Sequence, residues 1–177
     1  GGRGGRGRLG GLARRGPAGA VGGAIMGGAW GEAVEPGRWF TWTELERTGT
    51  GLPNVAPPDA RVGLRALVAH VLDPLRDDVG QPITVSSGYR SPAVNAAVGG
   101  ATGSDHIAGT NRAAADIDTD NLTSDALADR VIALGLPYDQ LITYGDTSHL
   151  HVSWRGTAGR RERLYRATAS SDYEEVT

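Results

Sequence analysis

The first 28 residues set the strongest limit on what this chain can fold into. They are rich in glycine and have neither helical nor strand periodicity, so ordering them would cost much backbone entropy. Folded structure is therefore expected only after this segment. We predict a disordered leader over residues 1–37, one folded domain over residues 38–156 and a C-terminal tail over residues 157–177.

Composition narrows the chemistry of the folded part. The chain has no cysteine, which excludes disulfides, thiolate metal sites and cysteine nucleophiles. All 18 of its cationic side chains are arginines, which excludes lysine chemistry. Any metal must therefore be bound by His, Asp or Glu. No apolar run is long enough to span a bilayer, so we expect no transmembrane segment, and 177 residues suit a single core.

Charge is unevenly distributed along the chain. The first 25 residues contain five arginines and no acid: Arg3, Arg6, Arg8, Arg14 and Arg15. The remainder is acidic, and we expect no nucleic-acid binding by the folded domain. The leader is either a flexible extension or an Arg/Gly tract that binds RNA or anionic surfaces, and it fits a signal peptide poorly. Met26, the only methionine, is the expected start of the native chain.

Beyond the leader, helical and strand patterns are mixed. Thr43 is expected to cap a short helix, and apolar residues at helical spacing predict a core helix that ends before Pro74. Further helices are predicted over residues 93–98 and 122–134, and strands over 83–87, 113–118, 138–144 and 149–154. The tail suggests at most a short helix. These elements predict an α+β domain with a small antiparallel sheet and flanking helices.

Histidines and acids concentrate in the second half of the chain. His106 lies in a Gly-rich loop, and His149 and His151 are two residues apart on a predicted strand, so they share one face. Asp116 and Asp118 share a face in the same way. Because a catalytic zinc ion takes three His or carboxylate ligands, His106, Asp116 and His151 would supply such a set. Accidentally paired surface histidines are the alternative.

Three segments carry a resemblance to a known family. SSGYRSPAVNAAVGGATGSDHIAG, AAADID and HLHVSW together resemble the zinc D-Ala-D-Ala carboxypeptidase family of metallopeptidases, which includes phage and prophage cell-wall enzymes. The family pattern SxHxxGxAxD begins at Ser104, His106 and Gly109 and resumes at Ala114 and Asp116. Three extra residues separate its halves. We expect them to bulge as a loop without moving the ligands.

The resemblance implies a role for each matching residue. His106, Asp116 and His151 are expected to bind one zinc ion, and His149 is expected to be the non-ligand histidine that acts in proton transfer. Arg90 is expected to grip the terminal carboxylate of the substrate, since a guanidinium matches a planar carboxylate. A simple salt bridge is the alternative for Arg90.

Two positions bear on the identity of the general base. Ser148 stands where other branches of the family have a glutamate, and Asp146 is either a substitute base or only a turn residue. Ser104, Tyr89 and Gln140 are expected to line the substrate groove.

The resemblance implies a hedgehog/DD-peptidase-like fold and zinc-dependent hydrolysis of peptidoglycan stem peptides. We expect a D-Ala-D-Ala carboxypeptidase because of Arg90. An endopeptidase that cleaves between L-Ala and D-Glu and an inactive peptidoglycan-binding module are alternatives. The expected partner is a peptidoglycan peptide, the expected state is a monomer, and the expected place of action is the cell wall outside the cytoplasm, reached by export or by phage release.

Overall fold

A computed structural model describes Gly1 and residues 34–145, 147–169 and 172–176. Residues 2–33 of the predicted leader, Met26 included, lie outside this part of the chain. The described domain is built on a mixed sheet with the strand order β1-β2-β4-β3-β5-β6. The strands are β1 (Thr84–Ser87), β2 (Arg112–Asp118), β3 (Gln140–Thr143), β4 (Leu150–Arg155), β5 (Arg163–Ala169) and β6 (Asp172–Glu175). The predicted α+β class is confirmed.

The expectation of a purely antiparallel sheet is wrong in one place. Neighbouring strands pair antiparallel except for β3 and β5, which run parallel. Both β5 and β6 come from the segment predicted as a tail with at most a short helix, so that expectation is also wrong. Residues 163–167 read RLYRA, and Leu164 packs against the core when the segment forms a strand beside β3.

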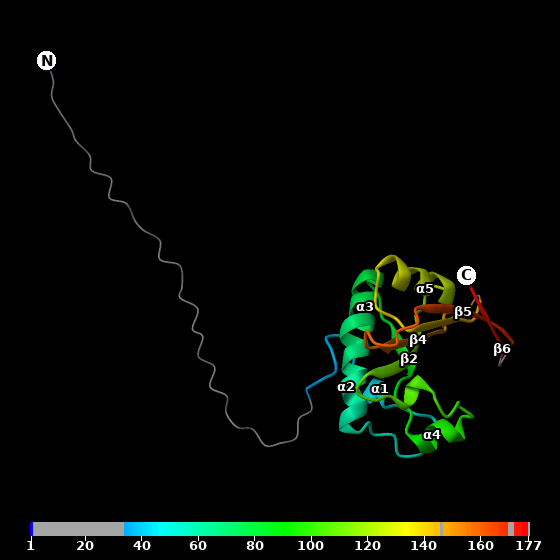
Figure 1. Cartoon of the computed structure of the whole chain (residues 1–177). Coiled ribbons are helices and arrows are strands. Elements are labelled where there is room, and N and C mark those ends of the chain that lie inside the picture. The colour runs from blue at the N-terminus through cyan, green and yellow to red at the C-terminus, as the bar shows by residue number, and fades with distance from the viewer. Residues whose placement is uncertain (2–33, 146, 170–171, 177) are drawn as a thin grey trace. The chain divides into compact units, whose positions relative to one another are not determined.

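Helices flank the sheet (Figure 1). They are α1 (Trp42–Leu45), α2 (Pro58–Leu67), α3 (Asp73–Val79), α4 (Pro92–Ala97) and α5 (Ser124–Ala133). The α2 helix packs on β2 and β4, and α5 packs on β3 and β4. Their apolar side chains join those of the strands in one core cluster that includes Leu64, Leu67, Ile117, Leu127 and Val152. No helix among the described residues is long and apolar enough to cross a membrane.

The core helix does not end before Pro74 as predicted. A π-helical turn, η1 (Val68–Leu72), joins α2 to α3, and the backbone N–H of Asp73 donates to the Val68 carbonyl. Proline lacks an N–H and its ring clashes with the preceding turn of an α-helix. The wider π turn relieves this conflict just before Pro74, so the chain stays helical over residues 58–79.

Small residues let α2 approach the sheet closely. Gly63 faces the start of β2, where an added Cβ would collide with the backbone carbonyls of Gly109 and Arg112. The side chains of Ala113 and Ala115 on β2 are fully buried beneath the helices. This close packing fixes β2, which carries Asp116 on its opposite face.

The short helix α1 begins two residues earlier than predicted. Thr41, rather than Thr43, is the N-cap, and its hydroxyl accepts a hydrogen bond from the Glu44 backbone N–H while Glu44 bonds back to Thr41. The reciprocal pair is a capping box, whose signature in the sequence is a Thr followed three residues later by a Glu. Thr123 caps α5, where its hydroxyl accepts a hydrogen bond from the Ala126 N–H.

Candidate metal centre

Two of the predicted ligands lie side by side on the open face of the sheet. Asp116 on β2 and His151 on β4 are direct partners in the antiparallel ladder, and Ile142 on β3 is the next residue in the same row. Because side chains alternate along a strand, Ile117, Leu150 and Val152 point to the core instead. The alternation that buries the core thus places Asp116 and His151 on the opposite face.

The third predicted ligand comes from a short turn above this face. His106 lies in the 3-10 turn η2 (Asp105–Ile107), which Ser104 caps by accepting a hydrogen bond from the His106 N–H. Its carbonyl accepts from the Arg90 N–H at 2.8 Å, and its ring Nδ1 lies 2.7 Å from the Gly88 carbonyl. An Nδ1–H donated to that carbonyl leaves Nε2 with a free lone pair, as a metal ligand needs.

The three side chains converge on one point. His106 Nε2 lies 3.2 Å from Asp116 Oδ1 and 3.3 Å from His151 Nδ1, and His151 Nδ1 lies 2.8 Å from Asp116 Oδ1. Zinc–ligand bonds of about 2.0–2.2 Å place tetrahedral ligand atoms roughly 3.3–3.6 Å apart, which is close to two of the three separations and slightly longer than the third. The spacing and the donor types therefore fit a single divalent ion, and His106, Asp116 and His151 could hold it.

The surroundings of Asp116 favour the ionised form of its carboxylate. Burial acts to raise its pKa, but the charges and hydrogen bonds of His106 and His151 outweigh burial and hold the pKa well below its usual range. Its second oxygen, Oδ2, accepts a 2.6 Å hydrogen bond from Arg90 Nη2. One oxygen therefore faces the histidines while the other is neutralised by a guanidinium.

Arg90 occupies a fixed position beside the ligands. Its Nε donates to Ser87 Oγ at 2.8 Å, and its side chain is only 20% exposed. The predicted alternative for this residue was a surface salt bridge, whereas the ion pair is largely buried and joins Arg90 to a candidate ligand. Asn54 fixes the flanking backbone because its amide donates to the Tyr89 carbonyl and accepts from the Ser91 N–H.

A cavity of about 660 Å³ opens over the cluster. Its lining includes all three predicted ligands, Arg90, and two of the residues expected to line a groove, Ser104 and Gln140. Tyr89 does not line it: the ring is 4% exposed in the core and borders a separate cavity of about 270 Å³ that it shares with Arg90. Such a volume is sufficient for a short peptide segment.

His149 lies beside the cluster but outside the lining of this cavity. Its Nδ1 is 3.4 Å from Asp118 Oδ1, and its ring meets the Tyr144 ring edge-on at 5.0 Å between centroids. Tyr144 does line the cavity, and burial together with a hydrogen bond to Tyr173 raises the pKa of its phenol. Ser148 borders a different cavity with Asp118, and Asp146 lies outside the described residues.

The three extra residues within the family pattern form a tight turn. Gly109 and Arg112 pair across it, with the Gly109 N–H donating to the Arg112 carbonyl at 3.0 Å. The turn leads directly into β2, and His106 and Asp116 on either side of it remain in contact. The insertion therefore leaves the side chains of these two candidate ligands in contact.

Several cavity residues were not predicted from the sequence. They are Asp105, Tyr144, Arg155, Arg161 and Tyr173. Asp105 and Tyr144 could have been found from their neighbours, because Asp105 precedes a ligand and Tyr144 continues the Gln140, Ile142 alternation. Arg155 could have been found in the same way, because it continues the His151, Ser153 alternation of β4. Arg161 and Tyr173 depend on how the C-terminal strands pair, which no local pattern indicates.

Comparison with protein families agrees with this geometry. The family model described as Peptidase M15 matches residues 41–153, which include all three cluster residues and Arg90. The chain belongs to the peptidase M15 family. M15 peptidases are zinc-dependent, so membership accounts for a His/Asp/His cluster in a cavity, and it confirms the family resemblance seen in the sequence. None of the curated proteins compared matches the chain.

Proposed function

We propose that this protein is a zinc-dependent peptidase of peptidoglycan stem peptides, and specifically a D-Ala-D-Ala carboxypeptidase. The observation that carries the proposal is the convergence of His106 Nε2, Asp116 Oδ1 and His151 Nδ1 within 3.3 Å of one another in an M15 domain. Three ligands leave a fourth position of a tetrahedral ion available for chemistry, as in catalytic zinc sites.

The chain's residues would hold and tune the ion in distinct ways. A bound zinc ion supplies Lewis acidity toward a peptide carbonyl and lowers the pKa of water to about 7. The Gly88 carbonyl fixes the His106 tautomer, and Arg90 fixes Asp116 through Oδ2. Such outer hydrogen bonds orient ligands and typically change metal affinity about 10–100-fold when lost.

His149 is the proposed proton donor to the leaving amine. Asp118, 3.4 Å from Nδ1, would orient the imidazole, and Tyr144 supports the ring edge-on. Its side chain is 35% exposed, so its protons exchange readily with solvent. Arg90 is the proposed partner of the substrate's terminal carboxylate, with Nη1 as the available group because Nε and Nη2 already bind Ser87 and Asp116.

The remaining expectations belong to the same proposal. The substrate places the site of action in the cell wall outside the cytoplasm, and we infer that the domain acts as a monomer. The sheet carries the candidate metal ligands on one face and packs against helices on the other, which supports a hedgehog/DD-peptidase-like fold. Ser104 and Gln140 would contact the peptide from two sides of the cavity.

The test is hydrolysis by zinc-loaded protein of a peptide that ends in D-Ala-D-Ala. Released D-alanine should appear with the wild type, disappear with a chelator and return when zinc is restored. Whole muropeptides analysed by mass spectrometry in parallel separate the alternatives. Cleavage only between L-Ala and D-Glu would replace the carboxypeptidase by an endopeptidase, and zinc-dependent binding without any cleavage would indicate an inactive module.

A further inference from the structure

One end of the cavity is built by a part of the chain that the M15 match does not reach. The match ends at residue 153, whereas Arg155, Arg161 and Tyr173 line the cavity together with the metal cluster. Arg155 ends β4, Arg161 precedes β5 and Tyr173 lies on β6. The parallel pairing of β5 with β3 brings this segment back beside Gln140. We call Arg155, Arg161 and their two carboxylate partners, Asp105 and Asp139, the arginine end.

Two buried carboxylates fix these arginines in place. Asp139 is fully buried and accepts from the Arg161 backbone N–H at 2.8 Å, from Arg161 Nε at 3.0 Å and from Arg161 Nη2 at 2.5 Å. Asp105, 7% exposed, accepts from Arg155 Nη2 at 2.8 Å. Arg155 Nε also lies 3.1 Å from Asp139. Such bonds hold the guanidiniums in a single orientation before any ligand arrives.

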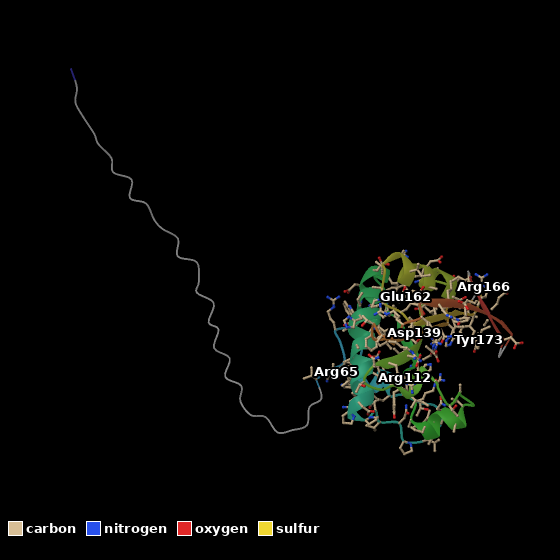
Figure 2. The ribbon with its side chains drawn as sticks, in the orientation of Figure 1. Arg65, Arg112, Asp139, Glu162, Arg166 and Tyr173 are labelled. Carbon is tan, nitrogen blue, oxygen red and sulfur yellow. The ribbon has the colours of Figure 1, made fainter. Side chains whose placement is uncertain are left out.

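The cluster carries more positive than negative charge. Arg112 is the third guanidinium, with its Nη1 3.7 Å from Asp105, so three arginines surround two carboxylates. Figure 2 labels Asp139 and Arg112 near the middle of the domain, with Tyr173 farther toward the C-terminal strands. The excess of one positive charge comes from Arg112, which borders Asp105 but does not itself line the cavity.

Arg155 and Arg161 each keep hydrogen-bond donors unused. Within the described residues, the Nη1 groups of Arg155 and Arg161 donate no hydrogen bond, and the two side chains are 30% and 39% exposed. A guanidinium offers its donors in a planar fork that matches a carboxylate. Gln140, which lines the same cavity, adds an amide donor.

We propose that the arginine end is a carboxylate-binding subsite for the substrate peptide, separate from Arg90 and supplied by the C-terminal segment. Asp105 connects it to the metal centre, because Asp105 binds Arg155 while the adjacent residue, His106, is a candidate ligand. The bound carboxylate is either one upstream of the cleaved bond or the C-terminal one, which the arginine end would then share with Arg90. This inference rests on the proposed peptidase function and names a feature of its substrate.

The test compares acid and amide peptides with the full, zinc-loaded chain. One pair is N-acetyl-L-Lys-D-Ala-D-Ala with a free or an amidated C-terminus. The other is L-Ala-γ-D-Glu-L-Lys-D-Ala-D-Ala with the α-carboxylate of D-Glu free or amidated. The wild type should prefer the acid in at least one pair, by about 10-fold in kcat/KM, mostly through KM. The pair that shows the preference identifies which carboxylate is bound.

Variants assign the preference to the arginine end. Arg161→Gln should reduce the ratio of acid to amide kcat/KM about 5-fold or more in the pair that shows it. Arg166→Gln is the matched control, because Arg166 lies on β5 but pairs with Asp125 of α5; it should keep the wild-type ratio. Arg161→Lys keeps a cation on Asp139 without the planar fork, so it decides the question if Arg161→Gln does not fold.

Two results would overturn the subsite. One is equal kcat/KM for acid and amide in both pairs with the wild type. The other is an acid preference that a folded Arg161→Gln or Arg161→Lys variant leaves unchanged. If the wild type cleaves no peptide, the proposed function has failed, and the subsite is then judged by the dissociation constants of the same peptides measured by calorimetry. Equal binding of acid and amide there would overturn it independently.

Discussion

The two ends of the cavity are built in different ways. At the metal end, the three candidate ligands contact one another, and all of them lie within the matched M15 segment. Their ligand atoms lie within 3.3 Å of one another. At the arginine end, carboxylates from the matched segment hold guanidiniums from the segment that follows it. The candidate metal ligands and Arg90 thus lie within the family segment, whereas the proposed carboxylate subsite adds two arginines from the segment that follows it.

The largest effect should come from removing a ligand at the metal end. Asp116→Asn replaces a carboxylate by a weaker neutral ligand and leaves Arg90 without its ion pair. Zinc affinity and hydrolysis should fall by more than the ~100-fold typical of an outer hydrogen bond. Zinc titration and D-alanine release measure both. Asp120→Asn, at an exposed position after β2, is the control and should match the wild type.

A large effect of another kind should follow a change at the arginine end. Asp139→Asn leaves the charges of Arg155 and Arg161 without their buried partner. Breaking a fully buried ion pair costs about 3–5 kcal/mol, and the loss here should be somewhat smaller because both arginines are partly exposed. Urea unfolding should show this loss, while the folded variant still binds one zinc ion. Asp125→Asn breaks only the exposed pair with Arg166 and should cost less than about 1 kcal/mol. Loss of zinc binding in folded Asp139→Asn would show that the two ends are not independent.

His149→Ala tests whether the metal end needs a proton donor that is not a ligand. Removing a general acid typically lowers the rate about 10²–10⁴-fold, so kcat should fall by at least ~100-fold with zinc content unchanged. His70→Ala is a suitable control, because His70 is exposed and stacks on Trp154 away from the metal cluster. An unchanged kcat in His149→Ala would remove this residue from the mechanism.

The smallest effect concerns how the folding stability of the metal-free protein depends on pH. A carboxyl group whose pKa is lowered by folding stabilises the folded state above its unfolded pKa of about 4, and this contribution is lost as the pH falls through the lowered pKa. Asp116 is such a group. The melting temperature of the wild type should therefore exceed that of Asp116→Asn near neutral pH, and this difference should narrow below about pH 4. A gap that widens toward low pH would contradict the assigned direction.

Much of the metal end could be predicted from the sequence because it follows local rules. Alternation predicted that Asp116 shares a face with Asp118 and that His151 shares a face with His149, and the structure then pairs Asp116 directly with His151. The family pattern supplied His106, which no periodicity could have brought to the other two. Sequence reasoning did not foresee that Arg90 binds Asp116, because that contact joins residues 26 positions apart.

The arginine end was missed for a physical reason. The segment that follows Trp154 has short strands with many charges, and local propensity alone did not distinguish them from a loose tail. Their strand structure depends on pairing with β3, and their arginines depend on Asp105 and Asp139, which lie far away in sequence. The prediction that the core helix ends before Pro74 was also wrong. A proline usually ends a helix, and only the π turn allows this helix to continue.

Anomalous diffraction at the zinc edge from crystals of zinc-loaded protein tests the central assignment most directly. The assignment predicts one strong peak per chain, bonded at about 2.0–2.2 Å to His106 Nε2, His151 Nδ1 and an Asp116 carboxylate oxygen. A peak bonded instead to His149 and Asp118, or no ordered zinc in a folded chain with all three side chains intact, would contradict it.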